Sequence, residues 1–103
     1  MGFVILGVSA IVAPSAQAAA CGSSLAPTVT GGQAQWSVQC VSGGSRVVGS
    51  VTDTKADGKC AYVSFSWSGG GSYTSARACP DGTTKSFDVT KAGKSVNGYL
   101  YVD

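Results

Sequence analysis

The sequence predicts an all-β fold, a small antiparallel β-sandwich of about six strands with two disulfides and little or no helix. Two observations predict it. Beyond its first residues the chain is rich in Gly, Ser, Thr and Val, and it contains no Glu, a composition that favours short strands over helices. Apolar and polar residues also alternate over short stretches between Gly-rich turns, which is typical of strands with one buried face.

Residues 1–18 are expected to form a signal peptide. Gly2–Ala13 is an uncharged apolar run that would span about 18 Å as a helix, less than the roughly 30 Å of bilayer hydrocarbon. Ala16-Gln17-Ala18 matches the A-x-A pattern of a cleavage site, and cleavage as late as Ala20 is an alternative. We therefore expect a secreted, extracellular protein with a single domain at 19–103 and no transmembrane segment in the mature chain.

Six stretches of the predicted domain carry the strand pattern, and turn signals separate them. The turn signals are Ser42-Gly43-Gly44, Asp57-Gly58, Gly69-Gly70-Gly71, Pro80-Asp81-Gly82 and Ala92-Gly93. The residues that mark the strands, in chain order, are Trp36, Val38 and Cys40; Val47, Val48 and Val51; Ala61, Val63, Phe65 and Trp67; the stretch 72–79; Lys85, Phe87 and Val89; and Val96, Gly98, Leu100 and Val102.

Four cysteines in an exported chain are expected to form two disulfides. A domain of this size buries only about 60% of its unfolded surface, so covalent cross-links are needed for stability. Four cysteines allow three pairings, and strand parity favours Cys21–Cys40 and Cys60–Cys79 over the other two. A lipid on Cys21, as in bacterial lipoproteins, is an alternative. It is disfavoured by Ala18, where such proteins carry a Leu-like residue, and by the odd number of cysteines it would leave.

The parity argument assumes a hairpin of residues 60–67 and 72–79. If Ser68–Gly71 closes this hairpin, Phe65 and Trp67 stay on its inner face, so one register satisfies both the disulfide and the hydrophobic pattern. The facing pairs are then Cys60–Cys79, Tyr62–Arg77, Val63–Ala76 and Ser64–Ser75, and the analogous N-terminal hairpin pairs Cys21 with Cys40 and Leu25 with Trp36.

The sequence offers few groups for catalysis. It has no His, the usual general base and the commonest metal ligand, and oxidised cysteines provide no thiol nucleophile. Asp53–Gly58 half resembles a calcium loop, but Lys55 occupies the third ligand position and no Glu follows. Asp81 and Asp88 lie in or near predicted turns, where Asp commonly shapes the backbone. We therefore predict a protein that is not an enzyme, with no metal and no cofactor.

The charge balance also narrows the partners. Seven Lys and Arg against five Asp give a net charge of +2, and the basic residues are scattered from Arg46 to Lys94. Nucleic-acid binding requires clustered basic residues, so no nucleic-acid partner is expected. The predicted partner is an extracellular protein or a glycan, and the oligomeric state is left open.

A candidate binding face lies on the polar side of the predicted hairpin. The assumed register brings Tyr62, Tyr73 and Arg77 together with Ser64 and Ser75. Amphipathic rings, hydroxyls and a guanidinium suit sugar rings or a protein partner. The alternative is an ordinary sheet surface on which Arg77 stacks over Tyr62.

Four further aromatic residues are divided between core and surface. Trp36 and Trp67 fall on apolar faces and are expected in the core. Tyr99 and Tyr101 share one face of the last strand, where they either form a second aromatic pair or cover the core.

One segment of the chain has a recognisable resemblance. Val51-Thr-Asp-Thr-Lys-Ala-Asp-Gly-Lys-Cys60, followed by Ala-Tyr-Val and later by Ala78-Cys-Pro-Asp-Gly82, resembles short exported proteins of actinomycete-type bacteria. The resemblance covers residues 46–88. It implies an exported β domain with two disulfides, and it carries over no catalytic residue.

The expected function is that of a secreted, non-catalytic binding or assembly module. It would recognise a protein partner or a cell-surface glycan through a sheet face or a strand edge. One alternative is a small proteinaceous hydrolase inhibitor that presents Thr28–Gln33 or Ser68–Ser72 as its inhibitory loop. A second alternative is an antimicrobial or toxin-complex subunit, which the mild positive charge supports weakly.

Overall fold

The structure, a computed structural model, describes residues 15–103, with side chains from Ala19 onward. In this range the chain forms nine strands and no helix, so it contains no helix long and apolar enough to cross a membrane. The strands are β1 (Ser15–Ala20), β2 (Ser23–Leu25), β3 (Thr28–Val29), β4 (Gly32–Val41), β5 (Gly44–Asp53), β6 (Ala61–Trp67), β7 (Ser72–Thr74), β8 (Thr84–Ala92) and β9 (Ser95–Val102).

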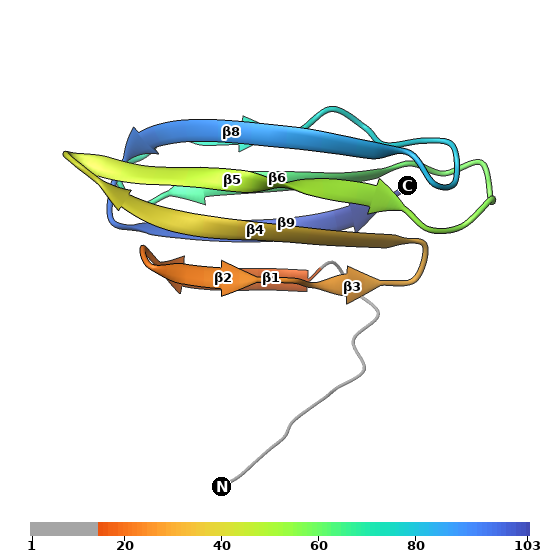
Figure 1. The fold of residues 1–103 in the computed structure, drawn as a ribbon, viewed down its shortest axis with the longest axis horizontal. Coiled ribbons are helices and arrows are strands. Elements are labelled where there is room, and N and C mark those ends of the chain that lie inside the picture. Colours follow the sequence, from red (N-terminus) through yellow and green to blue (C-terminus); the bar gives the residue numbers. More distant parts are fainter. Residues whose placement is uncertain (1–14) are drawn as a thin grey trace, which may run out of the picture.

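Two antiparallel sheets form the two layers of a sandwich (Figure 1). One sheet has the order β1-β9-β6-β7. The other has the order β2-β4-β5-β8, and β3 pairs with β4 beside β2. The predicted all-β antiparallel fold with two disulfides is therefore confirmed, although it has nine strands rather than about six.

The core lies between the facing sheets because β4, β5, β6 and β9 each bury alternate side chains. Phe65 of β6 is its central ring, 1% exposed. Its ring centroid lies 4.9 Å from that of Trp36 in an edge-to-face arrangement and 5.2 Å from that of Phe87, both typical aromatic packing distances. Trp67 is also buried, so the two tryptophans are core residues as predicted.

Both predicted disulfides are present, Cys21–Cys40 and Cys60–Cys79, and all four cysteines are used. The first bridge fastens the chain to β4 where it crosses from β1 to β2. Because the Cys21 sulfur is in a disulfide, it is not available for a lipid. The second bridge joins the start of β6 to the segment that follows β7.

The predicted register of the β6–β7 hairpin is wrong by one residue at its turn. The structure pairs Ser64 with Thr74 and Phe65 with Tyr73. The loop is shorter than expected because the Trp67 N–H donates to the Gly71 carbonyl (2.8 Å), and Gly70 takes the positive φ of 105° that such a tight turn requires.

An extra residue between Thr74 and Ala78 restores the predicted register at the other end of the hairpin. There Ala61 faces Ala78 in an isolated bridge, with N–H to carbonyl distances of 2.7 and 3.0 Å. The same parity places Cys60 opposite Cys79, which accounts for the correct disulfide despite the error at the turn.

The predicted leader, residues 1–18, lies outside the described residues as far as residue 14. The remainder coincides with β1, which runs antiparallel to β9 from Ser15 opposite Leu100 to Ala20 opposite Ser95. In this structure β1 therefore covers the β9 edge of its sheet.

Candidate functional site

Three tyrosines form a stacked row on the outer face of the β1-β9-β6-β7 sheet. The β6–β9 register places Tyr62 directly opposite Tyr101, and Tyr99 follows on the same face of β9. The ring centroids of Tyr62 and Tyr101 are 5.1 Å apart with planes at 17°, and those of Tyr99 and Tyr101 are 6.1 Å apart at 19°. We call Tyr62, Tyr99, Tyr101 and Arg77 the tyrosine ladder.

Arg77 caps one end of the tyrosine ladder. Its guanidinium carbon lies 4.4 Å from the centroid of the Tyr62 ring, within the range of cation–π attraction. The same guanidinium forms an ion pair with Asp103, and the Tyr62 hydroxyl donates to Asp103 Oδ2 at 3.1 Å. These contacts orient the Arg77 and Tyr62 side chains, although Arg77 and Asp103 remain half-exposed and the ion pair itself adds little stability.

The structure brings together three of the five predicted site residues. Tyr62 and Arg77 are in contact, and Ser64 lies on the same outer face, opposite Tyr99. Tyr73 is not on this face. It pairs with Phe65, an inner-face residue, and packs against the core because the turn is one residue shorter than expected.

Ser75 is also absent from the candidate face. It is 6% exposed, and its hydroxyl oxygen accepts a hydrogen bond from the Val63 N–H at 3.0 Å. Its own hydroxyl donates to the Ala76 carbonyl at 3.0 Å. The side chain therefore satisfies backbone groups where β7 has ended.

Sequence reasoning placed Tyr99 and Tyr101 on one face but did not join them to Tyr62. The missing information is the pairing of β6 with β9, two strands far apart in the sequence. Asp103 was not identified at all, because its role depends on the chain end lying beside Cys60, where the two residues exchange backbone hydrogen bonds of 2.9 and 3.1 Å.

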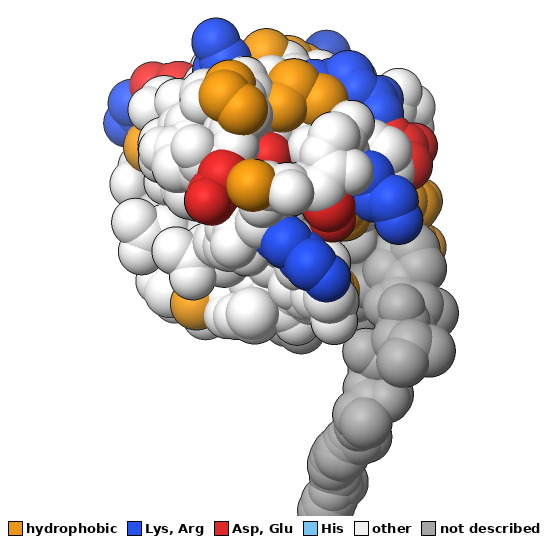
Figure 2. All heavy atoms as spheres, turned by 90° about the vertical axis from the view of Figure 1, so that its right-hand side faces the viewer, with side chains coloured by type: hydrophobic (Ala, Val, Ile, Leu, Met, Phe, Trp, Pro, Cys, Tyr) orange, Lys and Arg blue, Asp and Glu red, His pale blue; other side chains and the backbone are white. Residues whose placement is uncertain are grey.

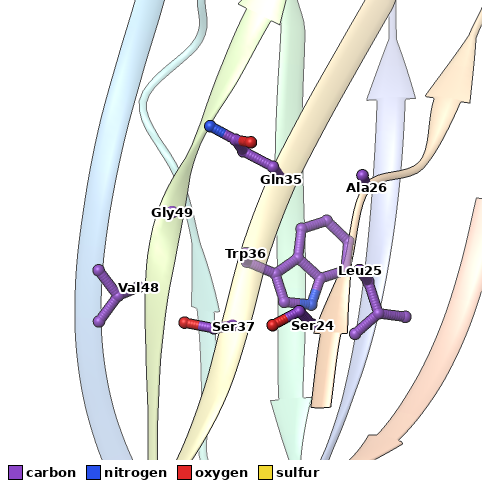
Figure 3. A pocket seen from close by; sticks show the side chains of 8 residues that line it. All are labelled: Ser24, Leu25, Ala26, Gln35, Trp36, Ser37, Val48 and Gly49. Carbon is purple, nitrogen blue, oxygen red and sulfur yellow. The ribbon is translucent and has the colours of Figure 1, made fainter.

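A shallow hollow occupies the outer face of the opposite sheet (Figure 3). Its volume is about 380 Å³. The lining residues carry no charge; they come from β2, β4 and β5 and the residue after β2, and are Ser24, Leu25, Ala26, Gln35, Trp36, Ser37, Val48 and Gly49. A second hollow of about 230 Å³ adjoins it at Ala26 and Gln35 and is lined by further Thr, Ser and Gln side chains.

An ion pair lies on the same sheet as the hollow. Arg46 of β5 donates to Asp88 of β8 through Nε at 2.9 Å and through Nη2 at 2.6 Å. The hydrogen bonds from Arg46 lower the pKa of the Asp88 carboxyl below its ordinary value, and the same contact raises the pKa of Arg46. Both groups are in full contact with solvent, so the pair is weak and screened by salt.

The Asp88 pKa predicts a small acid dependence of stability. A carboxyl with a lowered folded-state pKa stabilises the fold above its unfolded pKa, and this contribution is lost as the pH falls through the folded value. In urea unfolding, the stability advantage of the wild type over Asp88→Asn should therefore shrink between about pH 5 and about pH 2. Asp81→Asn, at a carboxylate without an ion pair among the described residues, should show no such trend. An advantage that stays constant over this range would contradict the prediction.

No group of three or more His, Cys, Asp or Glu side chains that could hold a metal ion occurs in the described part of the chain. Figure 2 shows the end of the sandwich near the β5–β6 connection, where Lys, Arg and Asp side chains are interspersed over the surface. This mixture forms no single strongly charged patch on the face shown.

The two segments considered as inhibitory loops are both tight turns. Thr28–Gln33 consists of β3, a turn with positive φ at Gly31 and the start of β4. Ser68 and Gly69 are tied by backbone hydrogen bonds to Ser95 and Ala92, at 2.9 and 3.2 Å. Comparison of the chain with models of protein families, with curated proteins and with solved structures finds no match.

Proposed function

We propose that this chain is a secreted, non-catalytic binding module that recognises an extracellular protein partner through the tyrosine ladder. The observation that carries the proposal is the ladder itself, three stacked tyrosines and an arginine on one solvent-facing sheet surface. Tyr and Arg are the residue types most enriched among the dominant contacts of protein interfaces.

The pre-ordering of these side chains supports a binding role. Each ring is held by a neighbour, and Arg77 is held by Tyr62 and Asp103. Ordering a flexible side chain at an interface costs about 0.5–1.5 kcal/mol, so a surface whose side chains are already fixed loses less on binding. The rings also stack on one another, which leaves their edges and hydroxyls for a partner more than their faces.

Secretion is supported by the sequence and by the disulfides. The apolar run Gly2–Ala13 and the A-x-A site before residue 19 have the form of a signal peptide. Two disulfides in so small a domain are typical of proteins that fold in an oxidising compartment. The inhibitor alternative has less support, because both of its candidate loops are held tightly against the sheets.

A glycan is a second candidate ligand, and a specific observation favours it. The hollow on the opposite sheet is uncharged and carries the hydroxyl and amide groups of Ser24, Gln35 and Ser37. Such groups match the hydroxyls of a neutral sugar chain, as expected of a site where a few polar groups fix the ligand.

Substitution of the ladder tests the proposal. Immobilised wild-type protein should retain a protein from culture medium or from a cell-envelope extract in stoichiometric amount. Tyr101→Ala should weaken that retention by about tenfold or more, the effect expected at a dominant interface residue, whereas Gln35→Ala on the opposite sheet should leave it unchanged. Thermal unfolding of both variants is the control for folding.

Other outcomes assign the function differently. Retention of a polysaccharide that is lost with Gln35→Ala and kept with Tyr101→Ala would replace the protein partner with a glycan. A retained hydrolase that loses activity would indicate an inhibitor. If nothing is retained, or if retention does not depend on Tyr101, the ladder proposal is wrong.

A further inference from the structure

The predicted cleavage site lies inside strand β1. Cleavage after Ala18 would remove Ser15–Ala18, which pair with β9 from Leu100 to Asn97, and would leave only Ala19 and Ala20 opposite Val96 and Ser95. The inference below thus rests on the secretion part of the proposed function. In the processed chain the outer edge of β9 would be uncovered from Asn97 to the end of the strand.

The uncovered edge would carry unpaired backbone groups. On the β1 side, the Lys94 carbonyl accepts from the Cys21 N–H at 2.9 Å, and on the β6 side the Asp103 N–H donates to the Cys60 carbonyl at 3.1 Å. Peptide groups alternate between the two sides of a strand. Gly98, Leu100 and Val102, which lie in phase with Lys94, therefore aim their N–H and C=O groups at the uncovered side.

This edge has none of the usual protection against pairing. Natural edge strands are blunted by Lys, by Pro, by inward-pointing charges, by bulges or by very short length. The β9 strand, Ser95–Val102, is eight residues long and contains no charged residue and no Pro. Its alternation is regular, with Val96, Gly98 and Leu100 buried.

We infer that the processed chain forms a symmetric dimer in which the β9 edges of two copies pair antiparallel about a two-fold axis at Leu100. The uncovered segment, 97–103, is centred on that residue. A two-fold axis there pairs Gly98 with Val102 and Leu100 with itself as hydrogen-bonded pairs, and every uncovered peptide group gains a partner. The remaining pairs of this register are Tyr99 with Tyr101 and Asn97 with Asp103.

The register also agrees with the side chains. Antiparallel partners lie on the same face, so the apolar inner faces of both copies stay inside their sandwiches. The smallest inner residue, Gly98, meets the larger Val102. On the outer face Tyr99 of one copy meets Tyr101 of the other, so the two tyrosine ladders become one continuous aromatic surface. Ala19 and Ala20 lie beyond the paired segment and do not block it.

Position 97 provides a test of both the dimer and its register. In this register Asn97 of each copy faces Asp103 of the other, and opposite charges directly across two strands are favourable while like charges are not. Asn97→Lys should tighten the dimer and Asn97→Asp should weaken it, each by about two- to fivefold. Asn97 is exposed on the outer face, so neither change disturbs the core.

The measurement is sedimentation equilibrium on protein secreted into the medium, with its N-terminus confirmed by mass spectrometry. The expected result is a reversible dimer with the two substitutions moving its dissociation constant in opposite directions. Hydrogen exchange should show the amides of Gly98, Leu100 and Val102 becoming protected as the concentration rises.

Several outcomes would overturn the dimer. These are a secreted chain that still begins at or before Ser15, a monomer at concentrations up to about 300 µM, or a dimer that is insensitive to both substitutions at position 97. Partner capture through Tyr101 is measured separately, so the ladder proposal and the dimer succeed or fail independently.

Discussion

Removal of the Cys60–Cys79 disulfide by the double substitution Cys60→Ser/Cys79→Ser is expected to lower the free energy of unfolding by about 3 kcal/mol. The bridge closes a loop with a sequence separation of 19, and its loss restores the conformational freedom of that loop to the unfolded chain. The replacement of both cysteines avoids a free thiol. Urea unfolding monitored by tryptophan fluorescence gives the measurement.

The local structure makes this bridge especially important. Strand β7 has only three residues, and the segment after it is joined to β6 mainly by the Ala61–Ala78 bridge. Without the disulfide, we expect the amides of this segment to exchange faster than those of the β4–β5 hairpin, which is paired over ten positions. The exposed substitution Ser66→Ala on β6 is the control. An unfolding midpoint equal to that of the wild type would show that the disulfide contributes no net stability.

The strands could be predicted because each buries one face. Alternation at Ala61, Val63, Phe65 and Trp67 identified β6 with the bounds that the structure shows. The disulfides followed from strand parity, which depends only on whether two residues lie on the same face. Predictions of this kind rely on local periodicity, and they do not require knowledge of which strands are neighbours in space.

The short N-terminal strands could not be predicted in the same way. Strands β2 and β3 have three and two residues, too few to show a period of two. They exist because β4 offers them an edge to pair with, over Trp36–Val38 and over Gly32–Gln33. Their formation is a consequence of tertiary context.

The candidate site shows where local reasoning stops. The error of one residue at the β6–β7 turn moved Tyr73 from the inner face to the outer face, because a shift of one residue exchanges the two faces of a strand. Arg77 was placed correctly over Tyr62 because the extra residue after Thr74 restored the parity. Tyr101, the main neighbour of Tyr62, required the β6–β9 pairing, and no local pattern encodes that pairing.

Gly49→Ala is expected to destabilise the protein by at least about 3 kcal/mol, or to prevent folding. Gly49 lies in the middle of β5, directly opposite Trp36 on β4 and Phe87 on β8. A Cβ at this position would overlap the backbone carbonyl oxygen of Gln35, and it would lie only 2.7 Å from Trp36 Cα and 2.8 Å from Trp36 Cβ. The obstruction is mostly backbone in a central strand, so it cannot move away without breaking the β4–β5 ladder.

The neighbouring residue supplies a matched control. Ser50 is next to Gly49 but faces the outer side of the sheet, so Ser50→Ala should change the free energy of unfolding by less than about 0.5 kcal/mol. Comparison of the two variants by urea unfolding separates the missing side chain at Gly49 from the general cost of substitution in β5. A Gly49→Ala protein as stable as Ser50→Ala would show that β5 does not approach Trp36 as closely as described. A large loss in Gly49→Ala alone would show that the absence of a side chain at this position allows Trp36 and Phe87 to pack in the core.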